Sequence, residues 1–433
     1  MTTTQGNMTG RRTRSTTKSP KRRADVVMLK IQSLHSRANL LSGLRQKIAL
    51  PAASDISTDQ WLSLELQLAT ATNNLRRKLK AYVDKYYYER DNIRNRQKLI
   101  HLLGVLEMEM TNAYNFYDTF MDILAQRRSK NTGMLLKGCD ILALHAMRRG
   151  NLAELTVAPV VYCDRGFGAS ILREGVNVTK GIPNPVPFIA IPYSRISEKY
   201  NLISIFHEAG HQALVKLNMV DTWKDVIRQS LLRAGSPAYI ADLFANWSRE
   251  LIPDFWAFCL CGMAQTCSIR DVLVLPHHMM FTVSPVQPHP PSYLRFLVSV
   301  AWCRHIWGQG LWDTWEREWI ELYPLDNLDN VTKQTMITCR KYLPDLAKAI
   351  ITTRFRKFGN KPLTALFDMQ VIAPDRLIAW ADISKVNEPG FLALPAGVQL
   401  AAFRMMRESP AVKASELDRK MEAWLYSLIN INN

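Results

Sequence analysis

The segment over residues 59–83 alternates apolar and basic positions with the period of an α-helix. Its apolar positions are Leu64, Leu68, Ala71, Leu75, Leu79 and Val83, and its basic positions are Arg76, Arg77, Lys78 and Lys80. Residues three or four apart share one face of a helix, so the pattern predicts a long amphipathic helix with a basic outer face. Further helices are predicted over residues 26–50, 97–126 and 137–149.

The pattern changes after Gly150. Two short apolar runs, residues 157–162 and 188–193, are separated by seven glycines and prolines, which predicts a small sheet with turns. Helical patterns then return. Ser236 and Pro237 have the N-cap and first-turn character of a helix start, and helices are predicted again from residue 331 onward.

These patterns together predict an α+β fold that is mostly helical. We divide the chain into a basic tail (1–24), an N-terminal helical region (25–149), a core with the small sheet (150–325) and a C-terminal helical region (326–433). A chain of 433 residues is long enough for two or three domains, which agrees with this division.

The formal net charge of +17 is unevenly distributed. Residues 1–24 carry seven basic residues and no acidic one: Arg11, Arg12, Arg14, Lys18, Lys21, Arg22 and Arg23. With almost no apolar residues, this tail is expected to be disordered and solvated. The alternatives are a sorting signal or a tether for a polyanion such as nucleic acid.

The seven cysteines form no CxxC pair and lie in apolar surroundings, so we expect free buried thiols in a reducing cytoplasm. The N-terminus lacks the apolar region of a signal peptide. The longest apolar runs are shorter than the ~18 to 20 residues of a membrane span. We therefore expect a soluble, cytoplasmic protein.

Near the middle of the chain, residues 207–211 read His-Glu-Ala-Gly-His, an HExxH pattern. Four residues apart on a helix, His207 and His211 project from one face and can share a metal ion. Two imidazoles are the usual start of a catalytic zinc site, and Glu208 can take a proton from zinc-bound water. The alternative is a helix whose histidines fill polar gaps in a core, but the apolar flanks make a buried polar triplet there costly.

A catalytic zinc usually has three protein ligands. Residues 212–217 contain no further histidine, so the third ligand must come from elsewhere. Glu250 and Asp254, four residues apart, supply the glutamate to bind zinc and the aspartate to accept the free N–H of a ligating histidine. This is the gluzincin arrangement.

Pro253 lies between these two residues. Inside a helix it removes an N–H and clashes with the carbonyl of Arg249, so a kink there is one expectation. Glu198 and Asp242 are the reserve carboxylates, with less suitable spacing.

Three segments in order resemble a known family. HEAGH (207–211), ELIPD (250–254) and HPPSYLR (289–295) are similar to the HExxH, ExxxD and HPxxxxR series of the HtpX-like and CAAX-prenyl-protease family of gluzincins. The resemblance covers residues 207–295 and implies a zincin-like catalytic core. It also implies that His289 stabilises the oxyanion or steadies the substrate and that Arg295 braces that segment. The best-known members of the family are embedded in membranes, so only the catalytic cluster is shared.

Two features around this cluster remain open in the sequence. Tyr293 competes with His289 as the donor to the oxyanion, since a phenol and an imidazole can both hydrogen-bond developing charge. Zinc peptidases of this kind set an edge strand along the cleft, and we take residues 188–193 as the candidate for it.

We interpret the chain as a zinc-dependent metalloendopeptidase. Zn²⁺ is the expected cofactor, held by His207, His211 and Glu250, with Glu208 as general base and a protein or peptide as substrate. One alternative is a non-catalytic binding or structural protein on a gluzincin-like scaffold, whose basic tail and helices bind an acidic partner. Another is a protease effector delivered into another cell, exported without a cleaved signal peptide through residues 1–24.

Overall fold

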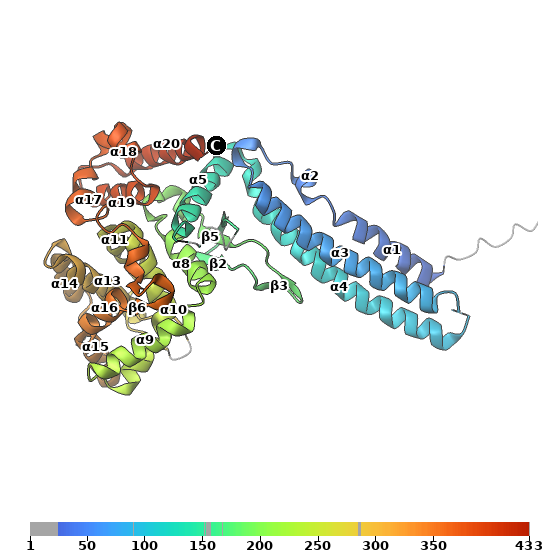
Figure 1. Ribbon diagram of the computed structural model, residues 1–433, viewed down its shortest axis with the longest axis horizontal. Coiled ribbons are helices and arrows are strands. Elements are labelled where there is room, and N and C mark those ends of the chain that lie inside the picture. Colours follow the sequence, from blue (N-terminus) through green and yellow to red (C-terminus); the bar gives the residue numbers. More distant parts are fainter. Residues whose placement is uncertain are drawn as a thin grey trace, which may run out of the picture. The chain divides into compact units, whose positions relative to one another are not determined.

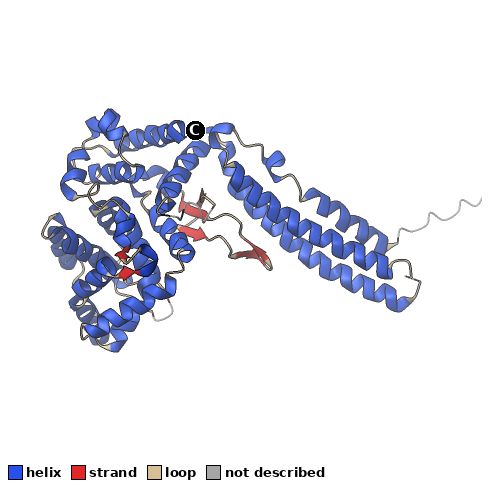
Figure 2. Ribbon diagram, in the orientation of Figure 1, coloured by secondary structure: helices blue, strands red, loops and turns tan. Residues whose placement is uncertain are grey.

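The computed structural model describes residues 25–89, 91–150, 152, 157–166, 168–284 and 287–432. Most of these residues lie in helices and a few form short strands (Figure 2), so the prediction of a mostly helical protein with a small sheet is confirmed. The basic tail over residues 1–24 lies outside the described residues.

The chain divides into two compact units. The smaller unit is formed by residues up to Leu40 and by Thr72–Thr111, and the larger unit by Leu41–Ala71 and Asn112–Asn433. Helices α3 (Thr58–Tyr86) and α4 (Ile93–Ala125) contribute residues to both. The boundaries predicted at residues 149 and 325 stay predictions.

In the smaller unit, α1 (Val26–Leu40) runs alongside parts of α3 and α4 (Figure 1). Leu34, Leu75, Leu79, Leu99 and Leu103 are among the leucines buried between these helices. Packing of these apolar faces stabilises amphipathic helices more than their intrinsic helix propensity does.

Ion pairs lie along the same helices. Glu107 of α4 accepts hydrogen bonds from Arg37, at 2.7 Å, and from Lys30 of α1, and Lys78 of α3 pairs with Glu109 at 2.7 Å. The hydrogen bond from Arg37, although burial opposes it, lowers the pKa of Glu107 to about 2. The basic side of the predicted amphipathic helix is thus partly neutralised by α4.

The larger unit contains a three-stranded sheet in the order β1 (Val160–Asp164), β5 (Phe188–Pro192), β2 (Ser170–Leu172). β5 is parallel to β1 and antiparallel to β2, with Ile189 opposite both Val161 and Ile171. All five residues of β5 are buried. The strand predicted over residues 188–193 is confirmed as β5, but it is paired on both sides and so is not an edge strand. β1 and β2 are the two edge strands of this sheet.

Short pairs of strands and many helices complete this unit. The strand pairs are β3 (Asn177–Thr179) with β4 (Ile182–Pro183) and β6 (Arg354–Phe355) with β7 (Lys361–Pro362). The helices are α2 (Leu44–Ile48), α5 (Lys130–Met147), α7 (Ser194–Ser197), α8 (Ser204–Lys216), α9 (Val220–Arg233), α10 (Ala238–Cys261), α11 (Met263–Val272), α12 (His277–Met280), α13 (Ser292–Trp307), α14 (Leu311–Leu322), α15 (Asn330–Lys341), α16 (Leu343–Thr352), α17 (Pro374–Trp380), α18 (Pro389–Leu392), α19 (Ala396–Met406) and α20 (Ala414–Asn432).

A buried ion pair ties the sheet to α5. Arg127 donates to both carboxylate oxygens of Asp140 at 2.7 and 2.9 Å, and to the carbonyl of Val161 at 2.7 Å. Asp140 in turn accepts from the backbone N–H of Val161 at 2.7 Å. Because the charges are paired and further hydrogen-bonded, their burial is tolerated, and β1 is fixed in register against α5.

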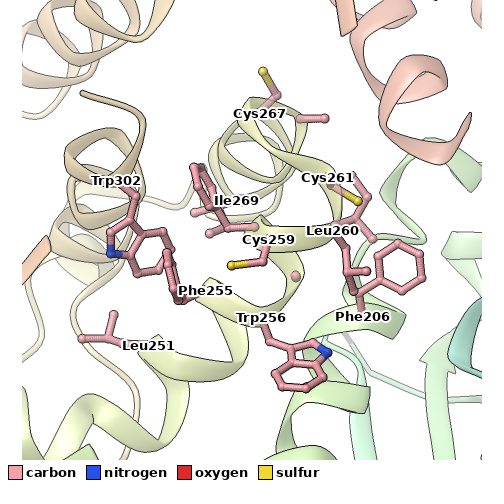
Figure 3. Packing of buried hydrophobic residues seen from close by; sticks show 14 of the residues in the cluster. Phe206, Leu251, Phe255, Trp256, Cys259, Leu260, Cys261, Cys267, Ile269 and Trp302 are labelled. Atoms are coloured by element: carbon pink, nitrogen blue, oxygen red, sulfur yellow. The ribbon is translucent and has the colours of Figure 1, made fainter. Parts of the chain in front are cut away.

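Helix α10 lies at the centre of the core and packs against α8 and α9. Its residues from Leu251 to Cys261 are all buried, and all of them except Asp254 are apolar. Phe255 of α10 meets Trp302 of α13 with ring centroids 5.1 Å apart (Figure 3). Trp256 of α10 donates to the carbonyl of Ala146 in α5 at 3.2 Å.

The crossing of α8 over α10 depends on a glycine. A Cβ at position 210 would lie 3.0 Å from the Cα of Pro253 and 3.0 Å from the Cβ of Trp256. Only glycine lets the two backbones approach so closely. α10 continues on both sides of Pro253, although the proline has no N–H for the carbonyl of Arg249.

The seven cysteines are buried and unpaired, as predicted. No helix among the described residues is long and apolar enough to cross a membrane.

Candidate metal centre

Helices α8 and α10 bring three ligand-type side chains together. The Nε2 atoms of His207 and His211 are 3.1 Å apart. Glu250 approaches both, with Oε2 at 3.3 Å from Nε2 of His207 and Oε1 at 3.7 Å from Nε2 of His211. One turn separates the two histidines on α8, and the close crossing at Gly210 carries the facing residue of α10 to them.

The dimensions of this cluster fit a tetrahedral zinc site. Zinc bonds of 2.0 to 2.2 Å to nitrogen and oxygen place neighbouring ligand atoms of a tetrahedron about 3.3 to 3.6 Å apart. The separations of 3.1 Å between the two imidazoles and 3.3 Å between His207 and Oε2 of Glu250 lie near that range, and the 3.7 Å contact of His211 is with the other oxygen, Oε1. With one ligand atom from each residue, all three atoms lie within 4.8 Å of one another. Two imidazoles and one carboxylate are also a donor set that zinc accepts, and three protein ligands leave a position open.

Asp254 holds one of these imidazoles in place. Its Oδ1 lies 2.7 Å from Nδ1 of His207, and Arg295 donates to its Oδ2 at 2.6 Å and its Oδ1 at 2.8 Å. Burial would raise the pKa of Asp254, but Arg295 and His207 outweigh it and hold the pKa well below its usual range. The carboxylate is thus an acceptor, and Nδ1–H of His207 donates, which turns Nε2 toward Glu250.

Pro253 does not separate Glu250 from Asp254. Both carboxylates contact His207, one through Nε2 and the other through Nδ1. Their spacing of four residues keeps them on one face, because the helix stays regular through the proline.

Glu208 lies beside the cluster and lines the cleft in front of it. Its exposed fraction is 5%, and it has no hydrogen-bond partner among the described residues. Burial raises its pKa to about 7, against the opposing effect of His207. A carboxylate with that pKa can accept a proton and give it up near neutral pH.

The two histidines differ in their affinity for a proton. Burial opposes protonation of His207, but the carboxylates of Asp254 and Glu250 raise its pKa to about 10. Burial and the neighbouring His207 lower the pKa of His211 to about 3. Burial would raise the pKa of Glu250, but the hydrogen bond and charge of His207 lower it to about 2. Without a metal, His207 therefore carries a proton on both ring nitrogens, while His211 stays neutral. A metal ion that binds Nε2 of His207 would displace the proton there.

His289 and Tyr293, the two candidates for the oxyanion, lie in different places. His289 lines the cleft, its side chain is 57% exposed, and its Nε2 is 3.3 Å from Oε2 of Glu250. Tyr293 is buried away from the cleft, where its hydroxyl accepts from Arg340 at 3.3 Å. Residues 293 and 295 are two apart on α13 and so point to nearly opposite sides, and Arg295 takes the side that faces the cluster. The structure brings only His289 to the site.

The reserve carboxylates are engaged elsewhere. Glu198 pairs with Arg195 at 2.8 Å, and Asp242 pairs with Arg228 at 2.6 Å. Neither belongs to the cluster of candidate ligands found among the described residues.

The cleft in front of the cluster has a volume of about 500 Å³. Ser170 and Ile171 of the edge strand β2 line one side, and Gln265, Ser268 and Ile269 of α11 line another. This strand is hard to predict from the sequence, because β2 has only three residues and follows a stretch rich in glycine. Arg173 and Arg249, which also line the cleft, were missed as well. Arg249 directly precedes the proposed ligand Glu250, which was the signal available.

Comparison with family models, with curated proteins and with solved structures found no match to this chain. The zincin-like core and the resemblance to the HtpX-like family therefore stay predictions.

Proposed function

We propose that this protein is a zinc-dependent metallopeptidase of the gluzincin type that hydrolyses peptide bonds within a protein or peptide substrate. The observation that carries the proposal is the convergence of His207, His211 and Glu250 on one point, with Glu208 free in the cleft beside them. Fixed ligands next to a carboxylate whose pKa is near 7 are the parts that metal-assisted hydrolysis requires.

In this proposal, the chain holds zinc through Nε2 of His207, Nε2 of His211 and the carboxylate of Glu250. When bound, the ion supplies a Lewis acid that polarises the scissile carbonyl and lowers the pKa of water. Asp254 keeps His207 in the tautomer that leaves Nε2 unprotonated, and Arg295 keeps Asp254 ionised and oriented.

Glu208 takes the proton of the attacking water and returns it to the nitrogen of the leaving amine. His289, exposed at the rim and within reach of the cluster, donates to the oxygen on which negative charge develops. The substrate lies extended along β2, an edge strand of the sheet beside which a further strand can add.

A peptide-cleavage assay tests the proposal. Purified protein is stripped with a chelator, reloaded with one equivalent of zinc, and incubated with a mixture of unstructured peptides that is read by mass spectrometry. We expect cleavage that is lost on chelation and restored by zinc. Zinc binding without cleavage of any peptide would contradict a peptidase and favour a binding protein on the same scaffold.

The two alternatives that depend on the basic tail stay predictions, because residues 1–24 lie outside the described residues. These are the capture of an acidic partner and delivery into another cell. No observation in the described part of the chain favours either.

A further inference from the structure

A smaller cavity opens beside the metal centre. It has a volume of about 280 Å³, and its lining includes Arg173, Arg249, Leu214, Trp223 and Ser248. We call it the Arg173–Arg249 pocket. Arg173, Arg249 and the proposed ligand His211 line both this pocket and the main cleft. The pocket therefore adjoins the cleft at His211.

The two arginines of the pocket carry charge that the protein does not neutralise. Neither Arg173 nor Arg249 forms an ion pair with a carboxylate of the described residues. The other two arginines of the cleft are paired, Arg195 with Glu198 and Arg295 with Asp254. Of the four arginines that line the cleft, the two without an ion pair among the described residues are thus the two that also line the Arg173–Arg249 pocket.

The rest of the lining adds little charge. Trp223, which is 1% exposed, contributes an apolar wall to the pocket. Asp221 is the one acidic residue of the lining, so two guanidinium groups leave one positive charge in excess.

These features are those of a receptor for a carboxylate. Guanidinium groups bind carboxylates through paired, charge-assisted hydrogen bonds. The apolar part of the lining, from Leu214, Val220 and the ring of Trp223, would surround the methylene groups that carry such a carboxylate.

We propose that the Arg173–Arg249 pocket binds a carboxylate of the substrate close to the scissile bond and makes the enzyme selective for acidic peptides. This inference rests on the proposed peptidase function. His211 lies in the walls of both cavities, and one extended residue spans only ~3.3 Å, so the bound residue is within one or two positions of the cleaved bond. The carboxylate comes from a glutamate or aspartate side chain, or from the C-terminus of the peptide.

Matched peptides test this selectivity. One series has an amidated C-terminus and carries Glu, Gln or Lys at each of the four positions around the cleaved bond, and a second series is neutral with a free or amidated C-terminus. We expect kcat/KM for Glu to exceed that for Gln by about tenfold or more at one position, as for a hydrogen bond to a charged group. A preference in the first series assigns the carboxylate to a side chain, and one confined to the second assigns it to the C-terminus.

Variants connect the preference to the pocket. In Arg173→Gln and Arg249→Gln, the ratio of kcat/KM between the acidic peptide and its amide counterpart should fall toward one. Arg317→Gln, which changes an exposed arginine on α14, should keep the wild-type ratio. Equal rates for acidic and neutral peptides in the wild type, or a ratio unchanged in both pocket variants, would overturn the proposal and leave the peptidase intact.

A binding measurement distinguishes a failure of the pocket proposal from a failure of the proposed peptidase function. Fluorescence anisotropy of labelled acidic and neutral peptides on zinc-loaded Glu208→Gln reports the pocket without turnover. If the wild-type protein cleaves no peptide, the peptidase proposal fails, and tighter binding of the acidic peptide still supports the pocket. Equal binding of both peptides would overturn it.

Discussion

Asp254 accepts a hydrogen bond from Nδ1 of His207 at 2.7 Å. The same carboxylate receives two hydrogen bonds from Arg295, so a residue of α13 sets the orientation of a ligand on α8 through α10. The candidate metal centre thus depends on three helices, and His207 is oriented by groups outside the three-residue cluster.

Replacing Asp254 by asparagine should weaken zinc binding by about 10- to 100-fold, the usual effect of losing such a supporting group. It should also destabilise the fold by about 3–5 kcal/mol, because it leaves the buried Arg295 charge without its partner. Isothermal titration with zinc and urea unfolding measure the two effects. Asp242→Asn, on the exposed side of the same helix, is the matched control and should change neither. Wild-type zinc affinity in Asp254→Asn would contradict the orienting role.

His289→Gln should lower kcat/KM by about 10²- to 10³-fold, the effect of removing one donor to an oxyanion. Its zinc content should equal that of the wild type, because His289 lies outside the three-residue cluster. Tyr293→Phe should cleave at nearly the wild-type rate, since its hydroxyl contacts Arg340 and not the cleft. Steady-state kinetics on one peptide compare the two. A greater loss in Tyr293→Phe would assign the oxyanion to the tyrosine.

Gly210→Ala should destabilise the protein by about 1–3 kcal/mol, because the new Cβ would lie 3.0 Å from the backbone of Pro253, which cannot turn aside. Separating α8 from α10 should weaken zinc binding as well. Gly104→Ala in α4 is the control. A Cβ there meets nothing within 4 Å, so helix propensity should leave stability equal or raise it by up to ~1 kcal/mol. Urea unfolding of both variants provides the comparison, and equal stability of Gly210→Ala and wild type would show that the crossing is not tight.

Zinc affinity should rise with pH. The pKa of His207 in the metal-free cluster is raised to about 10, so at pH 6 to 8 one proton must leave as zinc binds. Loss of one proton makes the apparent affinity increase about tenfold per pH unit in this window, up to the raised pKa. Competition with a zinc indicator at several pH values gives the slope. A zinc affinity that does not change between pH 6 and 8 would show that no proton leaves His207 when zinc binds.

The sequence was sufficient to predict which candidate ligands lie together, because their local spacing determines which of them share a helix face. His207 and His211 are one helical turn apart, and so are Glu250 and Asp254, so each pair could be placed on one face without knowing the fold. The crossing that joins the pairs depends on Gly210 meeting Pro253 across two helices, and no local pattern encodes it. From the sequence alone, Pro253 therefore suggested a kink. In the structure α10 stays helical there, and Pro253 packs against Gly210 of α8.

Local sequence patterns were also insufficient to predict how β5 is paired and which oxyanion candidate faces the cleft. The apolar run at residues 188–193 was recognised as a strand, but its pairing on both sides follows from β1 and β2, which are distant in sequence. Whether a strand is an edge is a property of the sheet. The choice between His289 and Tyr293 required the direction of each side chain on and before α13, which Arg295 and its contact with Asp254 determine.

The proposed roles of the two glutamates are tested most directly by comparing Glu208→Gln with Glu250→Gln. Zinc content and peptide cleavage are measured on the same samples. Glu208→Gln should keep one equivalent of zinc per chain and lose about 10²- to 10⁴-fold in cleavage rate, because it removes the base and no ligand. Glu250→Gln should lose zinc and cleavage together. Undiminished cleavage in Glu208→Gln, or full zinc content in Glu250→Gln, would contradict the central claim that these two glutamates act as base and ligand of one metal centre.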